Sequence, residues 1–287
     1  MKKKIALIGI DKPGARHFNE LKRSGIFELV GICDENKKGD YAKFEFFSTI
    51  DSMLAKTEPE AMIIATNNQQ AIVQKCMKSV KNILIDRPKF NSLEDVRVLQ
   101  YMIHTNGLNL SFFAPWRLNP TTASILRELE KEEKIYNINI TYGANDQNYD
   151  IKEAICKNLD LLFYISKSVC GEIKCEMPAG EKQISNANYI LRLKNGAISS
   201  ISLNLNYPKD IWKVRIVGKS GLYVADLVGF AMYKITPEGR INLKVDKNDQ
   251  NIALSQQNFA DSCEKKENQN ANIDDVLKIW ETLACVK

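Results

Sequence analysis

The sequence predicts an α/β domain with a doubly wound parallel sheet, followed by an α+β domain with a largely antiparallel sheet. Apolar runs alternate with helical segments through the first 113 or so residues, a pattern typical of a parallel sheet. A glycine-containing turn follows the first apolar run. Later strands alternate polar and apolar residues around Asn195-Gly196, a strong hairpin signal. We therefore divide the 287 residues into domains 1–118 and 119–287.

In the first domain, each expected strand is a short, nearly continuous apolar run, as in a sheet buried on both faces. Gly25 is expected to end the first helix, and Ser92 with Asp95 resembles a capping box. The expected strands are residues 4–10, 27–33, 61–66, 82–85 and 108–113. The expected helices are residues 14–24, 50–56, 68–79 and 92–104.

In the second domain, Asn119 followed by Pro120 predicts an N-cap and the first residue of a helix. Asn272 is a second plausible cap. The expected helices are residues 120–131, 151–169, 254–264 and 273–285. The expected strands are residues 135–142, 189–194, 197–206, 212–217, 232–235 and 241–245.

Composition excludes several classes of protein. Hydrophobic residues make up 44% of the chain, and no apolar run approaches the roughly 18 residues of a membrane helix. The net charge of +5 is spread along the chain, without the basic stripe of a nucleic-acid binder. Seven cysteines lack paired zinc spacing, which favours free thiols and no metal site. The apolar run after Met1 is too short for a signal peptide, so we expect a cytoplasmic protein.

The turn after the first strand carries Gly9, Asp11, Lys12 and Gly14. Gly9 and Gly14 occupy the first and third glycine positions of the G-x-G-x-x-G turn that binds a pyrophosphate at a helix N-terminus. Asp11 replaces the middle glycine and adds a negative charge, while Lys12 offers a positive one. This degenerate turn leaves two readings open, a dinucleotide site or a turn that merely contains glycines.

Asp34 ends the second strand, twenty residues after Gly14. A carboxylate at this distance accepts the adenosine ribose hydroxyls of NAD and repels the 2′-phosphate of NADP. Lys37 and Lys38 lie close enough in sequence to weaken that preference, so NADP is not excluded. The alternative is a carboxylate that only caps a loop.

The order of segments resembles the Gfo/Idh/MocA oxidoreductases (glucose–fructose oxidoreductase, inositol dehydrogenase and relatives) over essentially the whole chain. Thr66 and Asn67 resemble the turn near the nicotinamide, and residues 82–88 (NILIDRP) resemble the strand that ends in Glu-Lys-Pro. Residues 112–120 resemble the crossover, and residues 158–164 the helix that carries the family's histidine. The resemblance implies a Rossmann domain, NAD as cofactor, a sugar-like small-molecule substrate, and a homodimer or homotetramer.

The catalytic motifs depart from the family's pattern. Asp86 and Arg87 fall where the family has glutamate and lysine, and the resemblance implies that Asp86 binds the cofactor. Glu153 and Lys157 fall where the family has aspartate and histidine. The chain has two histidines, both in the first domain. An enzyme of this kind would therefore need another group for proton transfer.

A helix over 151–169 offers that group. Its positions 153, 157, 160 and 164 fall within about 60° on a helical wheel, so Glu153, Lys157, Asp160 and Tyr164 share one stripe. The stripe is either a solvated face or a catalytic one, and the family places it across the cleft from the nicotinamide. In the catalytic interpretation Lys157 carries the proton, Glu153 orients it and Tyr164 is a reserve acid. Arg87 does not titrate and stabilises an alkoxide.

Three functions remain open at the level of sequence. The first is hydride transfer between NAD(P) and a hydroxyl-bearing carbon of a sugar, cyclitol or nucleotide-sugar. The second is a non-catalytic nucleotide- or sugar-binding or scaffold protein, favoured by the departures at Asp11, Arg87 and Lys157. The third is a reductase that resembles biliverdin reductase and meets its proton demand differently. For Arg117, a structural role at the crossover is favoured over substrate contact.

Overall fold

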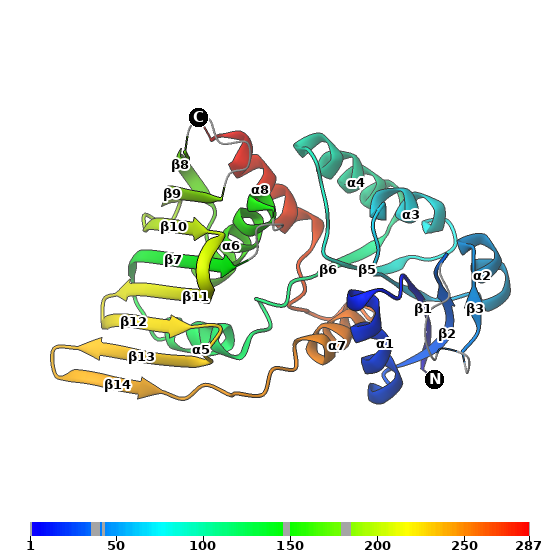
Figure 1. Ribbon diagram of the computed structural model, residues 1–287, viewed down its shortest axis with the longest axis horizontal. Coiled ribbons are helices and arrows are strands. Elements are labelled where there is room, and N and C mark those ends of the chain that lie inside the picture. Colours follow the sequence, from blue (N-terminus) through cyan, green and yellow to red (C-terminus); the bar gives the residue numbers. More distant parts are fainter. Residues whose placement is uncertain (1, 36–40, 42–43, 146–149, 179–184, 287) are drawn as a thin grey trace. The chain divides into compact units, whose positions relative to one another are not determined.

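The computed structural model describes residues 2–35, 41, 44–145, 150–178 and 185–286. The chain divides into two compact units, shown in Figure 1. Unit 1 comprises residues 1–115 and 250–277, and unit 2 comprises residues 116–249 and 278–287. No helix among the described residues has the length and apolar character to cross a membrane.

Unit 1 is built on a parallel sheet of six strands in the order β3-β2-β1-β4-β5-β6. All five neighbouring pairs are parallel. The residues of β4 and the central residues of β1 are almost fully buried, which explains their continuous apolar sequence. The strands are β1 (Lys3–Ile8), β2 (Phe27–Cys33), β3 (Phe46–Phe47), β4 (Ala61–Ile64), β5 (Asn82–Asp86) and β6 (Asn109–Phe113).

The helices of unit 1 connect these strands and carry the expected local signals. Gly25 ends the first helix in the left-handed conformation, and Ser92 and Asp95 form the expected capping box. The helices are α1 (Lys12–Ser24), α2 (Ile50–Thr57), α3 (Gln69–Cys76), α4 (Leu93–Asn106) and α7 (Asn251–Cys263). The first residues of α8 (Ile273–Ala284) also belong to this unit.

Unit 2 contains an eight-stranded sheet in the order β14-β13-β12-β11-β7-β10-β9-β8. One pair, β7 with β10, is parallel, and the other pairs are antiparallel. The strands are β7 (Ile135–Asn145), β8 (Cys170–Glu176), β9 (Asn186–Leu193), β10 (Ile198–Asn204), β11 (Asn206–Gly218), β12 (Gly221–Asp226), β13 (Ala231–Thr236) and β14 (Gly239–Leu243).

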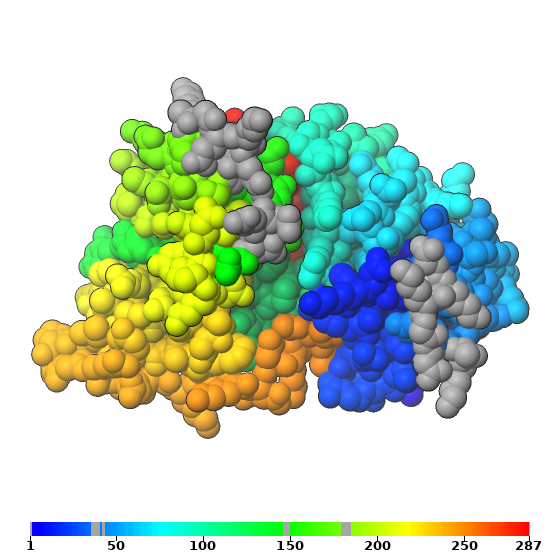
Figure 2. All heavy atoms as spheres, in the orientation of Figure 1, coloured from blue at the N-terminus to red at the C-terminus, as the bar shows by residue number. Residues whose placement is uncertain are grey.

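The core of unit 2 lies between one face of this sheet and helices α5 (Pro120–Leu129) and α6 (Ile151–Ser166), which Figure 1 shows on the same side. Asn119 caps α5 as expected, through its side-chain oxygen and the amide of Thr121. Gly196 has a φ of 88° in the predicted hairpin between β9 and β10. The hairpin of β13 and β14 is largely exposed at the end of the sheet, in the orange part of Figure 2.

The structure corrects the expected domain division at the C-terminal end. Residues 250–277 belong to unit 1, because α7 packs against α1 and β6 and its Phe259 is fully buried. Ala271 also forms a backbone bridge to Phe112 of β6. The first boundary lies at Pro115, close to the expected residue 118.

Three strands and several element ends differ from expectation. Strands β3, β8 and β12 were not predicted. The expected helices over 68–79 and 151–169 end at Cys76 and Ser166, and the one expected from residue 254 begins at Asn251. Strand β8 lies at the edge of its sheet and has one buried residue, Ile173, so it lacks the apolar alternation by which strands are predicted.

Candidate functional site

The strand order of unit 1 reverses between β1 and β4, the place where open α/β sheets bind nucleotides. Gly9 follows β1 with a φ of 86°, and a Cβ atom there would lie 2.8 Å from the Ala65 oxygen and 2.9 Å from the Thr66 Cβ. A Cβ atom on Gly14 would lie 1.9 Å from the Gly9 oxygen. Both glycines are therefore required by the close approach of β1, α1 and the residues after β4.

Helix α1 begins at Lys12, with Asp11 as its N-cap and Pro13 in its first turn. The Asp11 side chain makes no capping hydrogen bond and is exposed. The Lys12 side chain is exposed at the same helix end. A helix N-terminus attracts an anion through its unpaired amides and its dipole, and Lys12 adds a full positive charge there.

Asp34 lies immediately after β2, and its Oδ2 accepts a hydrogen bond of 2.9 Å from the Ile10 amide. The carboxylate is thus fixed to the turn that contains Gly9. Its position is that expected of a ribose-binding acid, and it also has a local role in closing the turn. Lys37 and Lys38 lie outside the described residues.

Thr66 and Asn67 lie at the carboxyl end of β4, beside the turn after β1. Asn67 accepts a hydrogen bond of 3.3 Å from the Lys89 Nζ, and Lys89 belongs to the segment after β5. The segments that follow two neighbouring strands are therefore linked at this edge of the sheet.

Asp86, expected to bind cofactor, has a fully buried side chain at the end of β5. Its Oδ2 lies 3.4 Å from the Nε2 of the buried His17 and 3.9 Å from the Nη2 of Arg16, both on α1. Within the described part of the chain, neither carboxylate oxygen has a hydrogen-bond partner. The carboxylate of Asp86 therefore faces α1 inside the unit and is not exposed at the carboxyl edge of the sheet.

Arg87 is exposed and has a φ of 55°, a left-handed conformation that is uncommon outside glycine. The carbonyls of Asp86 and Arg87 both accept hydrogen bonds from the side chain of Gln69. Gln69 is a residue that sequence reasoning missed. The sequence carries no signal for it, because its partners are backbone atoms on another strand's loop.

In unit 2, Asp150 caps helix α6, and the apolar residues expected to pack on the sheet do so. The Lys157 Nζ lies 3.9 Å from the centre of the Tyr142 ring and 4.9 Å from that of Trp212. Aromatic faces stabilise a cation at these distances. Glu153 lies one helical turn before Lys157 and is exposed.

Asp160 corrects the expectation of a uniform polar stripe, because it is buried and fixed in place. It accepts hydrogen bonds from the Trp116 Nε1 at 2.5 Å, from the Arg117 Nε at 2.8 Å and from the Arg117 Nη2 at 2.5 Å. The Arg117 guanidinium also lies 4.8 Å from the centre of the Tyr164 ring. Arg117 therefore has the structural role that the sequence favours.

Burial keeps several thiols protonated. It raises the pKa of Cys33 and of Cys76 to about 11, and that of Cys156 to about 12. Thiols with such high pKa values are poor nucleophiles and poor metal ligands at neutral pH. Within the described part of the chain, no three acidic, cysteine or histidine side chains are grouped as metal ligands.

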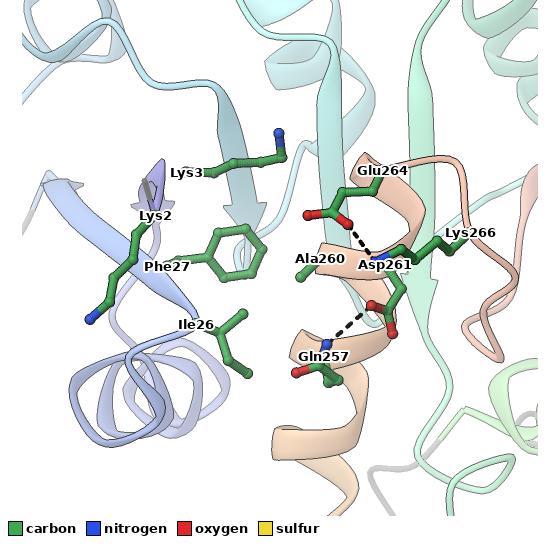
Figure 3. A pocket seen from close by; sticks show the side chains of 9 residues that line it. All are labelled: Lys2, Lys3, Ile26, Phe27, Gln257, Ala260, Asp261, Glu264 and Lys266. Carbon is green, nitrogen blue, oxygen red and sulfur yellow. Dashed lines mark hydrogen bonds and ion pairs between the residues drawn. The ribbon is translucent and has the colours of Figure 1, made fainter.

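A cavity of about 510 Å³ opens at the opposite end of the parallel strands, near the start of β2 (Figure 3). Phe27 and Ala260 line it together with Lys3, Glu264 and Lys266, and the last two form an ion pair of 2.6 Å. Nucleotides bind at the carboxyl ends of such strands, so we do not assign the cofactor to this cavity.

The fold and the turn at Gly9 define a dinucleotide-binding α/β unit joined to an α+β unit. Residues 3–113 match the family described as "Oxidoreductase family, NAD-binding Rossmann fold", the Gfo/Idh/MocA family. This match covers the first part of the chain and confirms the expected class, an NAD-binding oxidoreductase. No curated protein matches the chain in sequence.

Solved structures show the same fold over both units. UDP-N-acetylglucosamine 3-dehydrogenase from Acidithiobacillus ferrooxidans has a TM-score of 0.86 at 17% identity, with 99% of this chain and 97% of that one covered. An oxidoreductase from Agrobacterium radiobacter, in complex with NAD+, L-tartaric acid and magnesium, has a TM-score of 0.86 at 15% identity, with 100% and 95% covered. A protein from gentamicin A biosynthesis, in complex with NAD, has a TM-score of 0.81 at 15% identity, with 99% and 93% covered.

Proposed function

We propose that the protein transfers a hydride between NAD(H) and a hydroxyl-bearing carbon of a sugar, cyclitol or nucleotide-sugar. The observation that carries the proposal is the turn at the β1/β4 reversal, where Gly9 and Gly14 allow the close approach that a dinucleotide site needs. The substrate class is supported by the similar structure named as a UDP-N-acetylglucosamine 3-dehydrogenase.

The residues at this edge fit NAD. The N-terminus of α1 and Lys12 match the charge of a pyrophosphate, and the carboxylate of Asp34 suits ribose hydroxyls. Asp34 would repel a 2′-phosphate, so we propose a preference for NAD over NADP. Thr66 and Asn67 are proposed to line the site at the end of β4. When bound, NAD supplies the hydride acceptor or donor.

Proton transfer and charge stabilisation are assigned to the chain's own side chains. Lys157 is proposed as the proton carrier, since the rings of Tyr142 and Trp212 hold its ammonium in a defined place. Glu153 would orient Lys157, and Tyr164 would be the reserve acid. Arginine side chains in proteins are not deprotonated, so the guanidinium of Arg87 would stabilise a developing alkoxide.

We further propose that unit 2 pairs with a second copy of the chain through the open face of its sheet. Exposed apolar side chains lie on this face, including Ile190 at 58% and Ile198 at 42% exposure, and Ile198 and Val217 pair with the same residue of β7. Burying such a patch against a symmetry mate is the common way to form a homo-oligomer. The molar mass measured by light scattering should be that of a dimer or tetramer. Ile198→Lys should lower this mass towards that of the monomer.

The seven cysteines are free, which supports a reducing compartment, and we take this to be the cytoplasm. Activity is tested by supplying NAD+ with sugars, cyclitols and nucleotide-sugars and following NADH formation. Turnover of at least one of these classes is expected. NADH binding without turnover of any of them would instead favour a non-catalytic binding protein.

A further inference from the structure

The turn that presents Arg87 is held in an unfavourable backbone conformation. Arg87 has a φ of 55°, and it precedes Pro88, a position where steric contact normally restricts a residue to extended backbone. A non-glycine residue stays in such a conformation only when its surroundings enforce it. The contacts of this turn therefore show which residue holds Arg87 in its conformation.

Gln69, the first residue of α3, makes three hydrogen bonds to this turn. Its Nε2 donates to the Asp86 oxygen at 2.9 Å and to the Arg87 oxygen at 3.0 Å. Its Oε1 accepts from the Lys89 amide at 3.1 Å. The Gln69 residue is 8% exposed, so water competes little for these bonds. One buried amide thus uses both donor hydrogens and its acceptor on the segment from Asp86 to Lys89.

We propose that Gln69 is a positioning residue that enforces the left-handed conformation of Arg87 and so aims its guanidinium at the carboxyl edge of the sheet. The functional part of this inference rests on the proposed role of Arg87 in hydride transfer. Gln69 follows the segment after β4, so the loops after β4 and β5 are set as one unit. The hydrogen bond from Lys89 to Asn67 links the same two segments.

The first experiment measures whether Gln69 enforces the conformation of Arg87, and it needs no substrate. Glycine adopts a positive φ without strain, so Arg87→Gly should relieve strain in the wild type. In Gln69→Leu the turn can already relax, so the same substitution should change the Tm in a less stabilising direction there. We expect the two shifts in Tm to differ by about 2 °C or more.

Two matched controls accompany this cycle. Lys167 also has a positive φ, of 49°, at the end of α6. The shift in Tm caused by Lys167→Gly should therefore be the same in the wild type and in Gln69→Leu. Gln70, the next residue of α3, makes a long hydrogen bond of 3.5 Å to the Asp95 oxygen. Gln70→Leu should leave the effect of Arg87→Gly unchanged. Equal shifts for Arg87→Gly in the wild type and in Gln69→Leu would overturn the proposal.

The second experiment separates positioning from folding. Gln69→Glu retains the acceptor for the Lys89 amide but places an oxygen, in place of the donor, against two carbonyls. We expect it to lower kcat by at least about tenfold, with the Kd for NADH and the shape of the pH profile unchanged. UDP-N-acetylglucosamine with NAD+ is the first probe for turnover, followed by the other classes of the screen.

The outcomes distinguish this inference from the proposed function. A difference between the two Tm shifts without NADH binding keeps Gln69 as the residue that enforces the turn and refutes the dinucleotide site. Such a difference with unchanged kcat in Gln69→Glu makes Gln69 a purely structural residue and refutes the positioning role.

Discussion

Two buried carboxylates, one in each unit, have opposite surroundings. Asp160 in unit 2 accepts three hydrogen bonds, one from Trp116 and two from Arg117. Asp86 in unit 1 is also buried, and the nearest basic side chains among the described residues, His17 at 3.4 Å and Arg16 at 3.9 Å, make no hydrogen bond to it. The carboxylate of Asp160 is fixed in place by its hydrogen bonds and has a structural role. Asp86 lies directly before the strained residue Arg87.

The difference concerns the two carboxylates and not the two units as wholes. A saturated buried network rigidifies its surroundings, whereas a buried polar group without a partner needs an explanation such as a functional role or a bound water. Among the described residues, buried polar atoms without a hydrogen-bond partner occur in both units, on Asp86, His17 and Gln256 of unit 1 and on Asn158, Ser199 and Trp212 of unit 2. In unit 2 the same helix α6 carries the fixed Asp160 and, one turn earlier, the proposed proton carrier Lys157.

The largest expected effect concerns Lys157. Lys157→Met should lower kcat by about 10²–10⁴, the usual loss for a general acid or base, and should remove one limb of the pH profile. The Kd for NADH should barely change, since the residue is assigned to the substrate. The matched variant Arg87→Met should slow turnover and keep the shape of the profile. If Lys157→Met retains both rate and profile, α6 carries no proton chemistry.

A substitution of Asp160 tests whether its hydrogen bonds stabilise the fold. Asp160→Ala leaves the buried Arg117 without its counterion, so we expect the free energy of unfolding to fall by about 3–5 kcal/mol. The matched control is Glu172→Ala, which removes an exposed ion pair of 3.9 Å with Arg192 and should cost no more than about 1 kcal/mol. Urea unfolding measures both. An equal fall in the free energy of unfolding in the two variants would show that Asp160 does not have this structural role.

The same measurement at Asp86 should give a small effect. Asp86→Asn removes a buried carboxylate that has no hydrogen bond to lose, so the relief of its desolvation cost offsets the lost attraction to Arg16. We expect the free energy of unfolding to change by less than about 1.5 kcal/mol. Asp160→Asn is the isosteric comparison and should cost more. A reversed order would remove the contrast between the two carboxylates.

The smallest expected effect concerns the thiols and varies with pH. Burial raises the pKa of Cys156 to about 12, so at mildly alkaline pH this side chain is almost entirely the unreactive thiol. Iodoacetamide should modify the exposed Cys285 at least about tenfold faster, as peptide mass spectrometry would show. The rate at Cys156 should increase steeply only as the pH approaches its pKa. Equal rates at neutral pH would indicate that α6 opens readily.

Local sequence signals predicted much of the fold. The capping box of Ser92 and Asp95, the N-cap Asn119 and the hairpin at Asn195-Gly196 each depend on neighbouring residues, and each is present. Strand β8 was missed because its pattern is polar, and the residues of α7 were assigned to the wrong domain. The placement of α7 depends on contacts with α1 and β6 that lie far away in sequence.

The part of the candidate site that could be predicted from sequence is the part where the backbone geometry allows only glycine. Gly9 and Gly14 are required by steric contact, so a sequence pattern finds them. The contacts of Asp86, Asp160 and Gln69 depend on side chains or carbonyls that meet through the tertiary structure. The helical wheel placed Asp160 on a polar stripe because it contains no information about Trp116 and Arg117.

The most direct test of the account is a fluorescence titration of the wild type and Asp34→Ala with NADH and with NADPH. We expect the wild type to bind NADH more tightly than NADPH, because the carboxylate at the end of β2 accepts ribose hydroxyls. Asp34→Ala should weaken NADH binding by at least about tenfold, since charge-assisted hydrogen bonds are worth roughly 1.5–3 kcal/mol each. Equal affinity for both nucleotides would remove Asp34 from this role. No binding of either by the wild type would contradict the proposal of a working dinucleotide site.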